Sequence, residues 1–314
     1  MCLPSGTRPY PAVLIVGGTL SHTRDGEFYC PNRPWIPHRT ALKNLAWRLA
    51  DGGFASLRYD VRAHAAPEEQ AEDVRKSFDA FASCQDVDPQ RLCAAGESAG
   101  AYYTCLAAAN GMSLACYVLM GALHSSVEDL YQQNYGRVRD YAMSRPERKE
   151  WVMRMAPYEL AVGLNYKQMI KSAYDGARSK IISNGRNTYD VPLKTLQYEL
   201  THPPAALFKH LRAPVLVVQG SEDMNVPVED AFAIEESLRE SGNTAVTVRL
   251  IEGVDHSFQE TAATPEERMR ERISLGSFAR PYAEDFYETV TTYLSETLNT
   301  DESPVGAARI AEPA

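Results

Sequence analysis

The chain has 314 residues, of which 44% are hydrophobic and 23% charged, a balance typical of folded proteins and not of fibrous or disordered ones. Its net charge of −9 and the lack of any Lys/Arg run argue against binding to nucleic acid or to an anionic membrane. No apolar stretch approaches the roughly 18 residues that cross a bilayer, and the N-terminus lacks the basic and apolar parts of a signal peptide. The sequence therefore predicts a cytoplasmic protein.

The first half of the chain alternates between strand and helix patterns. The apolar run 13–16, stopped by two glycines, predicts a buried strand. Apolar residues at helical spacing then predict a helix over 42–49. Further strands are expected at 55–59, 92–95 and 115–120, with helices over 71–81 and 99–110 between them.

The alternation stops in the segment 125–200, which carries helix-like patches broken by proline and glycine. It contains eight of the chain's 17 tyrosines and predicts an inserted helical cap. The alternation then resumes, with strands expected at 215–219 and 245–251 and helices over 231–238 and 286–294. Residues 300–314 are expected to form a flexible tail.

This pattern predicts an α/β fold with a mainly parallel sheet and helices on both faces. Residues 1–124 and 201–299 would form the core, and 125–200 the helical cap. In such sheets ligands bind beyond the carboxyl ends of the strands. The motifs described next all fall at such ends.

A G-x-S-x-G motif, Gly96-Glu97-Ser98-Ala99-Gly100, lies between an expected strand and an expected helix. In this context the tight turn presents the serine hydroxyl above the sheet, and its glycines leave room for the neighbouring backbone. A glycine-rich strand-to-helix turn without catalytic function is the alternative for this motif taken alone.

Two further strand ends carry the partners that a serine nucleophile needs. Asp223 follows the strand 215–219, and His256 follows the strand 245–251. An imidazole can take the serine proton, and a carboxylate fixes the imidazole tautomer. Asp255 and Glu222 are rival acids, but Asp255 is adjacent to the histidine in sequence, and Asp223 has the better strand-end position.

The order Ser, Asp, His, the strand-end placement and the G-x-x-D-x-x-V stretch 220–226 resemble the α/β-hydrolase superfamily, in particular its capped, esterase- or thioesterase-like serine hydrolases. The resemblance covers about residues 10–124 and 205–298. It implies a catalytic triad of Ser98, Asp223 and His256. The chain departs from many relatives in carrying Gly17-Gly18 where they have His-Gly, and in having about a dozen residues before its first strand.

A serine hydrolase also needs N–H donors for the oxyanion that forms on the substrate carbonyl. The N–H of Ala99 is expected to be one donor. The second is expected from the loop after the first strand, with Thr19 as the best candidate.

Other residues with reactive side chains are given no catalytic role. The six cysteines form no C-x-x-C pair and have no histidine partners at metal-ligand spacing, so neither a metal nor a cofactor is expected. His124 follows the strand 115–120 and is interpreted as an ordinary loop or core residue, with a pocket role as the less favoured alternative.

The leading hypothesis is hydrolysis of a carboxylic ester or thioester through an acyl-serine. Acyl transfer or cyclisation by the same intermediate is the first alternative, followed by hydrolysis of a carbon–carbon bond and by a non-catalytic ligand-binding protein. The cap has twelve Lys and Arg against nine Asp and Glu, which leaves open a small-molecule acyl substrate that is anionic or carrier-linked. Pairing into a homodimer is also left open.

Overall fold

The computed structural model describes residues 1–28, 39–62 and 65–298. Its centre is a six-stranded sheet of order β2-β1-β3-β4-β7-β8 in which every neighbouring pair is parallel. The strands are β1 Tyr10–Val16, β2 Ala55–Arg58, β3 Val87–Glu97, β4 Cys116–Met120, β7 Val215–Gly220 and β8 Val246–Ile251. The mainly parallel sheet expected from the sequence is confirmed.

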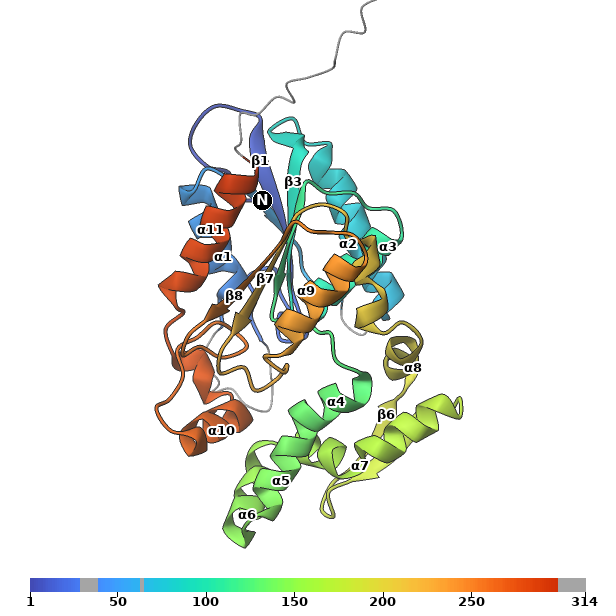
Figure 1. Cartoon of the computed structure of the whole chain (residues 1–314). Helices are drawn as coiled ribbons and strands as arrows, with labels where there is room; N and C mark the ends of the chain where they lie inside the picture. Colours follow the sequence, from blue (N-terminus) through green and yellow to red (C-terminus); the bar gives the residue numbers. More distant parts are fainter. Residues whose placement is uncertain (29–38, 63–64, 299–314) are drawn as a thin grey trace, which may run out of the picture.

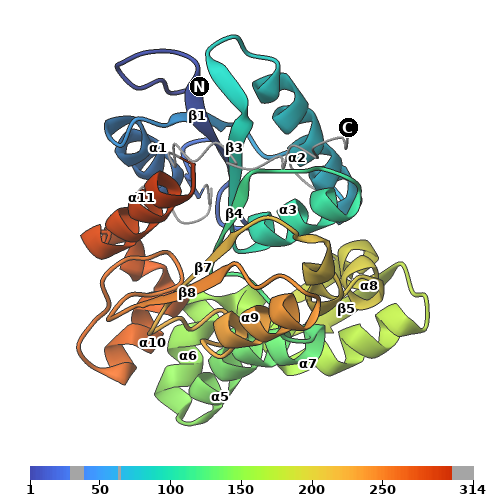
Figure 2. The same cartoon turned by 45° about the horizontal axis from the view of Figure 1, so that its top comes forward.

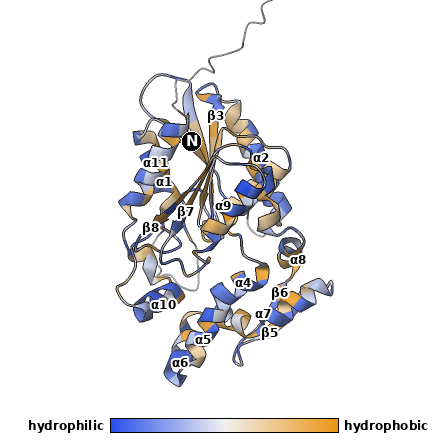
Figure 3. Cartoon of the chain, viewed as in Figure 1, coloured by the Kyte–Doolittle hydropathy of each residue, from blue (hydrophilic) through white to orange (hydrophobic). Residues whose placement is uncertain are grey.

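Helices cover both faces of the sheet (Figure 1). One face carries α2 Pro67–Ala82, α3 Ala99–Ala109 and α9 Asp230–Glu240, and the other carries α1 Ala41–Asp51 and α11 Glu284–Leu298. Successive strand residues enter opposite cores, as Leu14 and Ile15 of β1 do. Because both faces of the strands are buried, their sequences are continuous apolar runs. In Figure 3 the central strands are largely hydrophobic, whereas the helices are of mixed polarity.

Parallel pairing brings the carboxyl ends of the strands to one edge of the sheet. Val16 at the end of β1 pairs with Gly96 near the end of β3, and Gly220 of β7 pairs with Ile251 of β8. The loops that follow these strands therefore meet at this edge, where parallel sheets bind ligands.

The chain between β4 and β7 forms a separate layer beyond this edge (Figures 1 and 2). A π-helical turn, Gln132–Gly136, joins its first two helices. The inserted layer also contains an antiparallel hairpin of β5 Ser179–Ser183 and β6 Thr188–Pro192, which the expected helical cap did not include. Its elements are α4 Val127–Tyr131, α5 Arg137–Met143, α6 Pro146–Met155, α7 Pro157–Tyr174, β5 Ser179–Ser183, β6 Thr188–Pro192 and α8 Lys194–Thr201.

A further helix, α10 Pro265–Ser274, follows β8 and is absent from the sequence-based expectation. Its Ile273 packs with Val138 and Val152 of the inserted segment, so α10 joins that segment to the core. Within the described ranges, no helix is both long and apolar enough to span a membrane. The expected tail, 300–314, lies outside the described residues.

Candidate active site

Ser98 occupies a strained turn between β3 and α3. Its backbone has φ 53° and ψ −119°, a conformation that residues with a side chain rarely adopt. The flanking glycines are required by packing, because a Cβ at Gly96 would lie 2.6 Å from Ala101 Cα and a Cβ at Gly100 2.3 Å from the Val16 carbonyl oxygen. The G-x-S-x-G spacing is therefore a steric requirement of this turn.

Gly18, in the loop after β1, lies against the same turn. A Cβ on Gly18 would be 2.5 Å from the Glu97 carbonyl oxygen and 2.9 Å from Ser98 Cβ. Its own N–H donates to Glu97 Oε2 at 3.3 Å. The loop is thus held against the serine, and the N–H of Gly18 is already engaged.

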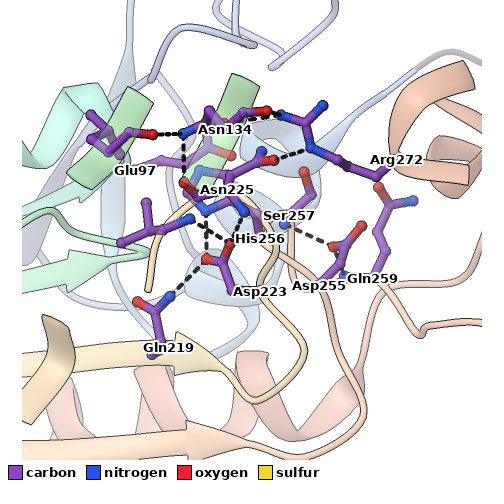
Figure 4. Close-up of polar contacts among 12 residues, drawn as sticks. Glu97, Asn134, Gln219, Asp223, Asn225, Asp255, His256, Ser257, Gln259 and Arg272 are labelled. Atoms are coloured by element: carbon purple, nitrogen blue, oxygen red, sulfur yellow. Dashed lines mark hydrogen bonds and ion pairs between the residues drawn. The ribbon is translucent and has the colours of Figure 1, made fainter. Parts of the chain in front are cut away.

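Asp223 and His256 form a buried hydrogen-bonded pair (Figure 4). His256 Nδ1 lies 2.6 Å from Asp223 Oδ2, and the two residues are 7% and 4% exposed. Gln219 Nε2 donates to the same carboxylate oxygen, while the N–H groups of Asn225 and Val226 donate to Oδ1. Four polar partners therefore fix the orientation of this carboxylate.

The charge of Asp223 determines the protonation of the imidazole. Burial lowers the pKa of His256, but the charge of Asp223 and its hydrogen bond outweigh burial and raise this pKa above the ordinary 6.5. The rival acids lie elsewhere: Asp255 accepts the N–H groups of Ser257 and Gln259, and Glu222 pairs with Arg268 at 3.2 Å.

Ser98 and His256 both lie against the end of β4. The Ser98 N–H donates to the carbonyl of Met120 at 2.8 Å, and the next residue, Gly121, abuts the imidazole. A Cβ on Gly121 would lie 3.0 Å from His256 Cε1. The Ser98 hydroxyl makes no hydrogen bond to another described residue, as is common for a nucleophile before substrate binds.

A cavity of about 460 Å³ opens in front of these residues. Ser98, His256, Thr19 and Ala99 all line it. Ala99 is the first residue of α3, where N–H groups have no acceptor within the helix. His124 is not among the lining residues; its Nε2 contacts Ser237 Oγ at 2.8 Å, which fits the ordinary structural role expected for it.

A buried charged network beneath the serine turn has no counterpart in the sequence-based expectations. Arg39, fully buried, forms an ion pair with Glu97, the residue before the serine. Arg39 also donates to Ser21 Oγ at 2.8 Å and Ser257 Oγ at 3.3 Å, and Ser21 Oγ donates to Glu97 at 2.7 Å. Burial opposes ionisation of Glu97, but Arg39 and Ser21 keep its pKa below the usual range.

A second unexpected contact joins three parts of the chain (Figure 4). Arg272 of α10 donates through Nε to Asn225 Oδ1 at 3.1 Å and through Nη2 to the backbone oxygen of Asn134 at 2.9 Å. Asn134 Nδ2 donates in turn to the Asn225 carbonyl at 2.5 Å. This Arg272–Asn134–Asn225 bridge links the π-helical turn to the loop that carries Asp223.

Five of the six cysteines are free thiols, and three of them are buried. Cys30 lies outside the described residues. None of the described cysteines lines the cavity.

Comparisons with known proteins agree with the observed fold. A sequence model described as the alpha/beta hydrolase family matches residues 12–271. None of the curated proteins matches the chain.

Several solved structures share the fold at low sequence identity. One is a 2,6-dihydroxy-pseudo-oxynicotine hydrolase, with a TM-score of 0.53 and 13% identity. The match covers 94% of this chain and 63% of the hydrolase chain. Est1E from Butyrivibrio proteoclasticus has a TM-score of 0.53 and 13% identity, with 93% and 89% of the two chains covered. The alpha/beta hydrolase GrgF from Penicillium sp. sh18 has a TM-score of 0.53 and 15% identity, with 94% and 92% covered. At these identities the likeness concerns the fold.

Proposed function

Since the chain belongs to the alpha/beta hydrolase family, we propose that it is a serine hydrolase that cleaves a carboxylic ester or thioester through an acyl-serine intermediate. One observation carries the proposal: Ser98, in its strained turn, and an imidazole bonded to a buried carboxylate face the same cavity.

In the proposed first step, His256 removes the proton of the Ser98 hydroxyl while the serine oxygen attacks the substrate carbonyl carbon. The raised pKa of His256 makes it a competent base, and Asp223 stabilises the imidazolium that forms. The oxyanion accepts hydrogen bonds from the N–H groups of Thr19 and Ala99. When the tetrahedral intermediate collapses, the bond to the alcohol or thiol breaks, and the imidazolium returns the proton to it.

In the second step, water attacks the acyl-serine, with His256 again as base, and releases the acid and the free serine.

Thr19 is assigned as an oxyanion donor because the N–H of the preceding residue, Gly18, is already bonded to Glu97. A donor of this kind contributes on the order of 3 kcal/mol to transition-state stabilisation.

The test is intact-mass spectrometry after treatment with a fluorophosphonate, which labels only an activated serine. We expect a single adduct on the native protein and none on Ser98→Ala. Ser277→Ala is the matched control, because Ser277 lines the same cavity, and it should be labelled like the native protein. Labelling that survives Ser98→Ala, or no labelling of the native protein, would overturn the proposal.

A further inference from the structure

Four polar side chains at one part of the cavity have no hydrogen-bond partner among the described residues. Glu199 comes from α8, Tyr131 and Tyr135 from α4 and the π-helical turn, and Tyr103 from α3. These residues are half-buried, and polar groups that face a cavity without a partner in the protein are available to a ligand.

The position of Glu199 is fixed relative to the nucleophile. The hydroxyl of Tyr102 on α3 donates to the carbonyl of His202, the residue that follows α8, at 2.8 Å. Glu199 lies one helical turn before His202, and Tyr102 lies one turn after Ser98. This bond therefore ties the end of α8, which carries Glu199, to α3, the helix that begins at the catalytic turn.

The surroundings of Glu199 favour a positive ligand. Burial raises the pKa of Glu199 to about 7, and no cation among the described residues offsets this effect. The carboxylate also contributes to the raised pKa values of Tyr103, Tyr131 and Tyr135, which places all three phenols within its field. The rings of Tyr131 and Tyr135 lie side by side, with centroids 5.2 Å apart.

The charged residues that line the cavity also favour a positive ligand. None of the twelve basic residues of 125–200 lines it, whereas two of the acidic residues of that segment, Glu159 and Glu199, do. The net positive charge of the segment is thus carried on other surfaces. Of the two arginines in the lining, Arg268 is paired with Glu222, and Arg272, which keeps its charge, donates to Asn134 and Asn225.

We propose that Glu199, with Tyr103 and Tyr131, forms a subsite for a cationic nitrogen, an alkylammonium or quaternary ammonium group, carried by the substrate. Carboxylates and aromatic rings are the groups that stabilise such cations in proteins. An anionic substrate group would be repelled there. The inference rests on the proposed function and adds to it the charge of the substrate.

The test compares 4-nitrophenyl esters of three acids that differ only at the far end of the acyl chain. The cationic acid is 4-(trimethylammonio)butanoic acid, its uncharged isostere is 5,5-dimethylhexanoic acid, and 4-sulfobutanoic acid carries a negative charge. We expect the native enzyme to prefer the cation over its isostere by about tenfold in kcat/KM, and to act least on the sulfonate.

Glu199→Gln keeps the shape of the side chain and should lower kcat/KM for the cationic ester about tenfold while changing the neutral ester less than about twofold. Glu271→Gln is the control, because it removes the same charge from the same cavity at a carboxylate already paired with Arg280. It should retain most of the preference. Equal loss for both esters in Glu199→Gln, or a preference for the sulfonate, would overturn the subsite.

A binding measurement separates this inference from the proposed function. Calorimetry on the Ser98→Ala protein compares the binding of 4-(trimethylammonio)butanamide with that of 5,5-dimethylhexanamide. This measurement does not depend on turnover. Tighter binding of the cation, lost in Ser98→Ala/Glu199→Gln, supports the subsite even if the native protein hydrolyses no ester. Equal binding of the two amides would overturn it even if fluorophosphonate labels Ser98.

Discussion

The guanidinium of Arg39 and the carboxylate of Glu97 form a buried ion pair directly beneath the turn that presents Ser98. Two charges taken out of water are stabilised only by each other and by well-placed hydrogen bonds. Here Ser21 and Ser257 supply such bonds and tie the pair to the loops of both Gly18 and His256. The pair therefore connects three of the loops that meet at the strand ends.

Removal of one charge from this pair should destabilise the protein strongly. Arg39→Met leaves Glu97 buried without its counterion, and we expect a loss of about 3–5 kcal/mol in the free energy of unfolding. Arg39→Met/Glu97→Gln should lose less than the sum of the single variants. Arg48→Met is the control, since the Arg48–Glu284 pair is exposed and should contribute under about 1 kcal/mol. Urea unfolding of Arg39→Met, Glu97→Gln, the double variant and Arg48→Met measures these losses, and equal losses at the two arginines would contradict the prediction.

The pH dependence of hydrolysis should report on His256. The imidazole acts as a base only when neutral, and its pKa is raised above 6.5, so kcat/KM should fall as the pH decreases through a midpoint above 6.5. Asp223→Asn removes the charge that raises this pKa, and should move the midpoint down and lower kcat by about ten-thousandfold.

Asp255→Asn is the matched control for that experiment, because Asp255 is adjacent to His256 but accepts backbone N–H groups instead of the imidazole. Its midpoint should stay close to that of the native enzyme. A midpoint that moves more in Asp255→Asn than in Asp223→Asn would reverse the assignment of the acid.

Gly18→Ala should damage catalysis more than stability. The new methyl group would meet the Glu97 carbonyl at 2.5 Å and displace the loop that carries the N–H of Thr19. We expect kcat to fall about 100- to 1000-fold, the usual effect of losing one oxyanion donor. Gly52→Ala, where a Cβ has only ordinary contacts of 3.4 Å or more, should leave kcat unchanged. Steady-state kinetics on both variants makes the comparison.

Arg272→Met should loosen the bridge to Asn134 and Asn225. The substitution removes hydrogen bonds that a charged guanidinium donates. Each bond of this kind contributes about 1.5–3 kcal/mol to stability. We expect faster limited proteolysis within 125–200 and at least about tenfold lower kcat/KM, because the loop of Asp223 loses a support. Arg270→Met is the control: Arg270 is on the same helix but stacks on Trp151, away from that loop. Identical proteolysis of the two variants would argue against the bridge.

The sequence predicts the parts of this structure that local pattern encodes. Buried parallel strands are continuous apolar runs, so five of the six predicted strands end within one residue of those observed. The exception is β3, which ends two residues later than expected, at Glu97, because Gly96 still pairs with β1 and β4 and Glu97 still pairs with β4. The same apolar runs predict where the strands end, and thus that Ser98, Asp223 and His256 lie just beyond strand ends.

Two further elements have local signals in the sequence. Asn184-Gly185, between alternating residues, is a typical hairpin turn and lies between β5 and β6. Thr264-Pro265-Glu266-Glu267 is a helix start with a capping box, which the structure forms at α10. The helix has only one buried residue, Ile273, so apolar periodicity could not reveal it.

The remaining contacts are set by tertiary structure alone. A charge at the end of the buried strand that holds Glu97 signals that a partner must exist, but nothing in the sequence selects Arg39, 58 residues away. The same holds for Glu199, whose significance depends on which residues face the cavity. Net charge counted along a segment cannot give that information.

The segment 125–200 leaves the sheet after β4 and returns before β7, and these two strands are hydrogen-bonded neighbours. An insertion whose two ends are this close can be exchanged for another without breaking the sheet. Ser98, Asp223 and His256 all lie outside the exchanged stretch, whereas Glu199 and Tyr131 lie inside it. Chimeras that replace 125–200 would thus retain the reactive groups and acquire a new chemical preference, provided that the donor segment keeps an amide at position 134 to meet Arg272.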